Sequence, residues 1–139
     1  MSLDVKARYQ GFQSMCKIVN TDGCYFLALC SIIEEYTDCP LDLIDAIRVS
    51  QSKGWVDSEF TIKNAPKFLE YYTGKKWVRS EMVSRLPVKI LDNQFTVVIH
   101  YNKRTGFKHF KRRGFDTLDD SVTVKEGVIL GYYIFTVQE

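Results

Sequence analysis

The stretch NTDGCYFLALCSII, residues 20–33, decides the fold because it is apolar almost without a break. It predicts a helix from about residue 23 to residue 36. Apolar side chains cover nearly the whole circumference of this helix, which is typical of a central helix packed on several sides. Glu34 and Glu35 are expected where the helix reaches solvent.

Two further helices are expected before the middle of the chain. Pro40 suits the first turn of the second helix, and Gly54 ends it. The third helix is predicted over residues 64–73, with Pro66 in its first turn and Gly74 as its C-cap. The apolar positions expected to face the core are Leu41, Ile44, Ile47, Val49, Phe68, Leu69 and Tyr72.

After Gly74 the sequence becomes rich in β-branched and aromatic residues separated by turn residues. The predicted strand segments are WVRSEMV (77–83), FTVVIHY (95–101), FKHFKRR (107–113) and GYYIFTV (131–137). Helices followed by strands predict an α+β fold rather than alternating βαβ units. With 139 residues and 45% hydrophobic content, we expect one domain over residues 1–139, with N-terminal helices packed on a C-terminal antiparallel sheet.

The cysteine spacing and the N-terminus limit the expected environment. The four cysteines, at positions 16, 24, 30 and 39, match no zinc-site spacing. A thiol nucleophile implies neither a metal nor an organic cofactor. The N-terminus MSLDVKARYQ lacks the apolar stretch of a signal peptide, so we expect reduced thiols and a cytoplasmic location. No stretch approaches the ~20 apolar residues of a membrane span, and no membrane partner is expected.

Cys24 is the candidate nucleophile among the four cysteines. Thr21 or Asp22 is a suitable N-cap just before it, and the N-terminus of a helix stabilises a negatively charged sulfur. The cysteines that lack this setting are Cys16, Cys30 and Cys39. The alternative is a structural role, since cysteine is among the most buried residue types and behaves as a small hydrophobe.

The chain has two histidines, His100 and His109, that could act as a base. His100 ends a predicted strand and is expected to be a surface or packed residue there. If FKHFKRR and GFDTL form a tight hairpin, His109 lies opposite Asp116, which could fix its tautomer. A longer loop with Gly114 in a bulge would shift this pair by one residue. The simpler interpretations are a solvated histidine and a turn aspartate.

Residues 103–113, KRTGFKHFKRR, hold six of the 19 Lys and Arg and no acidic residue. Interleaved aromatic and basic residues are one pattern of nucleic-acid binding. The rest of the chain is net acidic, however, and the solvated face of a hairpin has the same composition. The sequence therefore argues against nucleic acid as the partner.

Three segments resemble, in order, the papain-like cysteine peptidase fold. The resemblance is to small bacterial and phage proteins similar to the double-glycine-leader (bacteriocin-processing) peptidases, and it suggests a phage or prophage origin. DGCYFLALCSI resembles the nucleophile helix, and FTVVIHYNKRTGFKHF resembles the strands that deliver the histidine. FDTLDDSVTVKEGVILGYYIF resembles the closing loop and last strand. The three segments cover about a third of the chain.

This resemblance implies that Cys24 is the nucleophile, His109 the general base and acid, and Asp116 the residue that orients the histidine. The chain departs from the family in having Asp-Thr where Asp-Pro is typical, so Asp119 or Asp120 could take the third role. The family's oxyanion donor is usually a glutamine a few residues before the cysteine. The candidates for it here are Gln13 and Asn20.

The expected function is that of a cysteine peptidase, which hydrolyses amide bonds by a Cys-His-Asp triad. Its substrate would be a peptide, a protein or a peptidoglycan-like peptide. Basic side chains at the rim of the cleft would favour acidic substrates. These rim residues are Lys108, Lys111, Arg112 and Arg113. The alternative is a catalytically inactive papain-like module that binds a peptide or protein.

Overall fold

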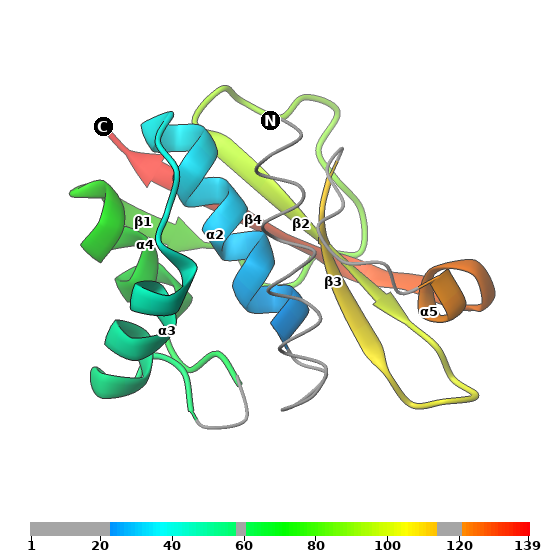
Figure 1. The fold of residues 1–139 in the computed structure, drawn as a ribbon. Helices are drawn as coiled ribbons and strands as arrows, with labels where there is room; N and C mark the ends of the chain where they lie inside the picture. Colours follow the sequence, from blue (N-terminus) through cyan, green and yellow to red (C-terminus); the bar gives the residue numbers. More distant parts are fainter. Residues whose placement is uncertain (1–22, 58–60, 114–120) are drawn as a thin grey trace.

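The computed structural model describes residues 23–57, 61–113 and 121–139. The elements in chain order are α2 (Gly23–Thr37), α3 (Leu43–Ser52), α4 (Ala65–Thr73), β1 (Lys76–Arg79), β2 (Gln94–Tyr101), β3 (Lys108–Arg112), α5 (Ser121–Glu126) and β4 (Val128–Gln138). Figure 1 shows α3 and α4 on one side of α2 and the strand β3 on the other. Helices precede an antiparallel sheet, which confirms the predicted α+β class.

The four strands form one antiparallel sheet in the order β1-β4-β2-β3. β4 pairs with β1 on one side and with β2 on the other. β3 lies at an edge, and its register places Ile99 of β2 opposite Phe110 and His100 opposite His109. All four predicted strand segments are present, because each combines strand-forming residues with turn residues at its ends.

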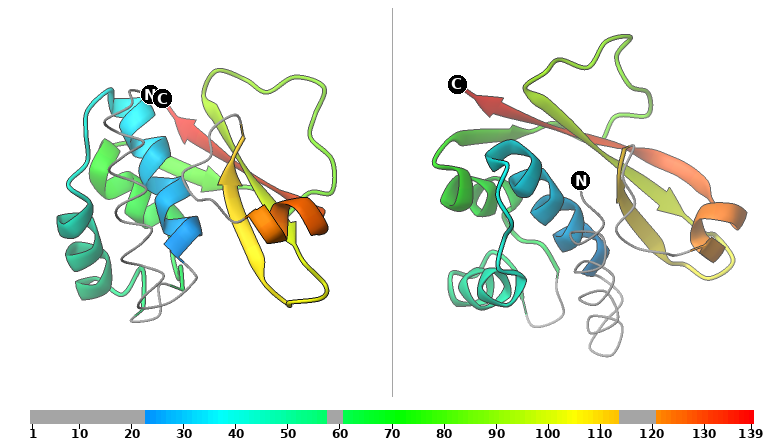
Figure 2. Two further views of the ribbon diagram at one scale, coloured as in Figure 1. Left: turned by 45° about the vertical axis from the view of Figure 1, so that its right-hand side comes forward. Right: turned by 45° about the horizontal axis from the view of Figure 1, so that its top comes forward.

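The helix α2 is the central helix, as its apolar sequence predicts. Every residue from Gly23 to Glu34 is buried, and Figure 2 shows α2 running between the α3–α4 pair and β3. The prediction that Glu34 reaches solvent is wrong. Its carboxylate is buried and accepts a hydrogen bond from the backbone N–H of Leu41 at 2.6 Å. Glu34 therefore fixes the segment between α2 and α3 against the end of α2. Glu35 is exposed, as expected.

The helix α3 begins later than predicted. Asp42 is its N-cap and accepts a hydrogen bond from a first-turn N–H at 3.1 Å, so Pro40 lies before the helix and not in its first turn. Of the predicted apolar stripe, Leu41 and Val49 are buried and Ile47 packs against the core, as predicted, and only Ile44 departs from it. Ile44 is 62% exposed, whereas Leu43 and Ala46 are buried.

The helix α4 confirms its prediction at both ends. Asn64 is the N-cap, and its side chain accepts a hydrogen bond from the N–H of Lys67 at 3.2 Å. Gly74 ends the helix in the left-handed conformation with a φ of 70°, which glycine adopts without steric cost. Phe68 and Leu69 are buried against the core, as predicted.

An ion pair ties the β2–β3 turn to α5. Arg104 donates to the carboxylate of Glu126 at 2.6 Å, and the side chain of Asn102 donates to the same carboxylate at 3.4 Å. The hydrogen bond from Arg104, and to a lesser extent that from Asn102, lowers the pKa of Glu126 below its ordinary value. The pair therefore joins the turn to the segment that leads into β4.

Candidate functional site

Cys24 lies in the first turn of α2, where the sequence predicts a nucleophile. Its side chain is 2% exposed, and its Sγ accepts a hydrogen bond from the backbone N–H of Phe110 at 3.5 Å. The sulfur thus lies between the N-terminus of a helix and an N–H group of β3. Both kinds of group interact favourably with negative charge on sulfur.

Two side chains of β3 hold this strand against α2. The ring of Phe110 stacks on Tyr25, with centroids 4.5 Å apart and an interplanar angle of 6°. Arg112 forms an ion pair with Glu35 at 2.7 Å and donates to the carbonyl of Ser31 at 3.3 Å. Residues two apart in a strand share a face, so these two side chains form the α2-facing side of β3.

His109 is fully buried in β3, and its direction follows from the same alternation. It lies opposite His100, and the two imidazole centroids are 6.2 Å apart. Its ring is therefore on the sheet face opposite the side chain of Phe110. The structure brings the sulfur of Cys24 to the peptide group that joins His109 to Phe110, and the imidazole of His109 lies beside that of His100.

The other predicted members of the site lie outside the described residues. They are Gln13, Asn20, Asp116, Asp119 and Asp120. The hairpin that would place Asp116 opposite His109 lies there too, as does the predicted N-cap of α2. In the described part of the chain, the residue opposite His109 is His100, at the predicted strand end and half-buried.

The four basic residues expected at a cleft rim have different surroundings. Lys108 and Arg113 are exposed, and Lys111 is partly buried. Arg112 departs from the expectation, because it is 7% exposed and its guanidinium is ion-paired with Glu35. It packs β3 against α2 instead of presenting charge at an open rim.

Three aromatic rings lie in a row beside Cys24, and the guanidinium of Arg79 lies against the last of them. The rings are Phe110, Tyr25 and Tyr133, and no sequence pattern predicts this arrangement. Tyr25, already stacked on Phe110, lies 6.0 Å from the ring of Tyr133. Arg79 lies 4.4 Å from the centroid of Tyr133 and donates to the Tyr25 hydroxyl at 3.4 Å. Burial raises the pKa of Tyr25, and the hydrogen bond from Arg79 offsets part of the rise.

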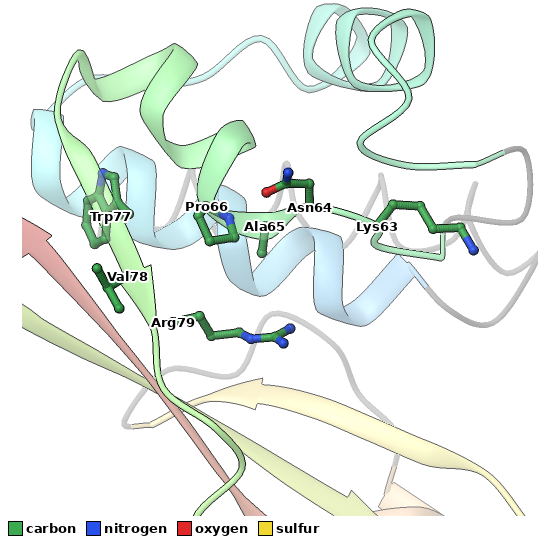
Figure 3. Close-up of a pocket in the computed structure, with 7 residues that line it drawn as sticks. All are labelled: Lys63, Asn64, Ala65, Pro66, Trp77, Val78 and Arg79. Carbon is green, nitrogen blue, oxygen red and sulfur yellow. The ribbon is translucent and has the colours of Figure 1, made fainter.

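A cavity of about 450 Å³ opens between the start of α4 and β1 (Figure 3). Its lining residues are Lys63, Asn64, Ala65, Pro66, Trp77, Val78 and Arg79. Because Arg79 also contacts Tyr25, one residue of the cavity touches the residue that follows Cys24. This cavity is not part of the predicted site.

Within residues 23–57, 61–113 and 121–139, no three His, Cys, Asp or Glu side chains are grouped so that they could hold a metal ion. None of the helices in these ranges combines the length and the hydrophobicity that crossing a membrane requires. Comparisons with models of known protein families, with curated proteins and with solved structures find no match to this chain.

Proposed function

We propose that this protein is a thiol-dependent hydrolase of peptide amide bonds, with Cys24 as nucleophile and His109 as general base and acid. The observation that carries the proposal is the position of Sγ, in the first turn of a buried helix and 3.5 Å from the N–H of Phe110. Phe110 follows His109 directly, so the two reactive residues come from elements in contact. A papain-like architecture, in which a nucleophile helix packs on the sheet that carries the histidine, is part of the same proposal.

The proposed reaction proceeds through a thioester. The thiolate of Cys24 attacks the carbonyl carbon of a peptide bond, and the C–N bond breaks as His109 gives a proton to the departing amine. Water, which loses a proton to the same imidazole, then attacks the thioester carbon. The C–S bond breaks, and the carboxylic acid leaves as the thiol is restored.

This mechanism includes a closed resting state. Cys24 is 2% exposed, and His109 is fully buried with its ring on the opposite sheet face from Phe110. General-base catalysis requires the imidazole to come within hydrogen-bond reach of the sulfur. A substrate can therefore reach the sulfur only when the contact between β3 and the start of α2 opens.

The burial of Cys24 favours a second candidate function, that of a catalytically inactive papain-like module that binds a peptide or protein. A nucleophile with 2% exposure is inaccessible in the closed state, whereas the cavity beside β1 is open. In this alternative, Cys24 is a packing residue at the contact between α2 and β3, and recognition takes place elsewhere on the surface.

An acyl-transfer assay separates the two candidates without knowledge of the natural substrate. The probe is p-nitrophenyl acetate, a small activated ester whose reaction with a nucleophilic thiol releases nitrophenolate and leaves an acetyl group on sulfur. We expect mass spectrometry to find the acetyl group on Cys24, and Cys24→Ser to abolish nitrophenolate release, while Cys39→Ser retains it. Acetylation confined to Cys39 or to lysines would select the binding module.

A further inference from the structure

The cavity between α4 and β1 carries two positive charges and no acidic side chain. Lys63 and Arg79 are the cations among its seven lining residues. Figure 3 shows the Arg79 side chain extending to a position below Ala65, whereas the Lys63 side chain lies farther along, beyond Asn64. Its volume of about 450 Å³ is large enough for a peptide side chain or a small ligand. Charge complementarity therefore favours an anionic occupant.

Arg79 is oriented by two tyrosines, and the carboxylate of Glu81 interacts with it electrostatically without forming an ion pair. Its guanidinium lies 4.4 Å from the ring of Tyr133 and donates to the hydroxyl of Tyr25 at 3.4 Å. No ion pair joins it to a carboxylate among the described residues. A guanidinium offers five N–H donors in a planar fork that matches a carboxylate. An orientated guanidinium of this kind favours a carboxylate ligand.

Lys63 has an acidic neighbour, but the pair between them is weak. Its Nζ lies 3.8 Å from a carboxylate oxygen of Asp57, and the two side chains are 59% and 36% exposed. Exposed pairs at such distances contribute little, because water and salt screen them. A ligand carboxylate can therefore compete with Asp57 for this ammonium group.

The backbone beside the cavity favours an extended peptide over a small anion. β1 is a terminal strand of the sheet, so its outer edge pairs with no other strand of the described chain. Such an edge can accept an extended peptide through main-chain hydrogen bonds. Val78 is exposed, and Pro66 and Trp77 add apolar surface to the cavity wall.

From these observations we infer that the cavity binds an extended acidic peptide, whose carboxylates pair with Arg79 and with Lys63 while its backbone lies along β1. The inference concerns recognition and not chemistry, so it holds for a hydrolase and for an inactive binding module. The link from Arg79 to Tyr25 would place the bound peptide next to the residue that follows Cys24.

The test measures peptide binding by calorimetry to the Cys24→Ala protein, which cannot cleave its ligand. The probes are the N-acetylated, C-amidated hexapeptides Ala-Glu-Glu-Ala-Glu-Ala and Ala-Gln-Gln-Ala-Gln-Ala. We expect the glutamate peptide to bind roughly tenfold more tightly, because a charge-assisted pair replaces a neutral contact. A third probe, the glutamine peptide with a free C-terminus, tells whether a terminal carboxylate serves as well as a side-chain carboxylate.

Three variants assign the site. Arg79→Gln should weaken binding of the glutamate peptide by about tenfold, and Lys63→Gln by about threefold, because the exposed lysine contributes less. Lys89→Gln, an exposed cation outside the cavity, should leave the affinity unchanged. Near-UV circular dichroism checks that Arg79→Gln keeps its fold. Lys63→Gln is a second variant of the cavity, and it leaves the contact between Arg79 and Tyr133 in place.

The inference is overturned if the glutamate and glutamine peptides bind equally, or if neither cavity variant weakens binding. It is also overturned if inorganic phosphate displaces the glutamate peptide while free glutamate, at equal concentration and pH, does not, since the site would then be a phosphate site. None of these outcomes depends on whether Cys24 is acetylated by p-nitrophenyl acetate. Failure of the cavity and failure of the proposed hydrolase are therefore distinguishable.

Discussion

The sulfur of Cys24 and the backbone N–H of Phe110 are joined by a hydrogen bond of 3.5 Å between residues 86 positions apart. The ring of Phe110 also stacks on Tyr25, the residue after Cys24, with centroids 4.5 Å apart, and this stacking supports the contact. It fixes the start of α2 against the edge strand that carries His109. The proposed chemistry depends on this contact more than on any other feature of the molecule.

Replacing His109 by Asn should remove the general base and acid. We expect nitrophenolate release from p-nitrophenyl acetate to fall by about 10²–10⁴, the usual effect of losing a positioned acid–base group. The matched control is His100→Asn, because His100 lies opposite on the same sheet face but is not assigned to the chemistry. Equal rates in the two variants, with both folded by circular dichroism, would exclude His109 from the reaction.

Replacing Arg112 by Met should loosen the packing of β3 on α2. The variant loses the 2.7 Å ion pair with Glu35 and the hydrogen bond to Ser31, while Glu35 is half-exposed and can be rehydrated. We expect the free energy of unfolding to fall by about 2 kcal/mol, measured by urea denaturation. Arg113→Met, the exposed neighbour, should change it by less than about 0.5 kcal/mol. Similar losses for the two arginines would contradict the packing role.

The pair between Arg104 and Glu126 should make stability depend on acid pH. Because the pKa of Glu126 is lowered in the folded protein, its contribution is complete above the unfolded-state pKa and is lost as the pH falls through the folded-state pKa. We expect Glu126→Gln to be less stable than the native protein at pH ~7, and the difference to shrink as the pH falls through the lowered pKa of Glu126. Asp92→Asn, an exposed loop control, should show no such convergence. A difference that stays constant with pH would contradict the assignment.

The parts of the fold that the sequence predicts correctly are those with local signals at their ends. The helix α4 has an N-cap asparagine, a proline in its first turn and a C-cap glycine, and its bounds agree with the prediction. The helix α3 has two competing start signals, Pro40 and Asp42, and the structure uses the aspartate because its carboxylate satisfies a first-turn N–H. The helix therefore starts after Pro40, and of the residues predicted to face the core in this segment, Ile44 is exposed.

The candidate site is less accessible to prediction, because its contacts are not local. The apolar run after Gly23 predicts that Cys24 lies in the first turn of a helix. Its hydrogen-bond donor is the backbone N–H of Phe110 in β3, and because every residue except proline has such a group, the sequence does not indicate which one is the donor. The ion pair of Arg112 could have been suspected from strand alternation with Phe110, since both share a face. The contact of Arg79 with Tyr25 joins residues 54 apart, and no local pattern indicates it.

The most direct measurement of the central claim is the rate at which iodoacetamide alkylates each cysteine of the native protein at neutral pH, read by mass spectrometry. Cys39 is exposed and Cys24 is 2% exposed, so accessibility alone favours Cys39. If Cys24 is a nucleophile reached through opening of the β3 edge, it should react about tenfold faster than Cys39 despite its burial. Alkylation of Cys39 first, with Cys24 modified only after unfolding, would contradict the account.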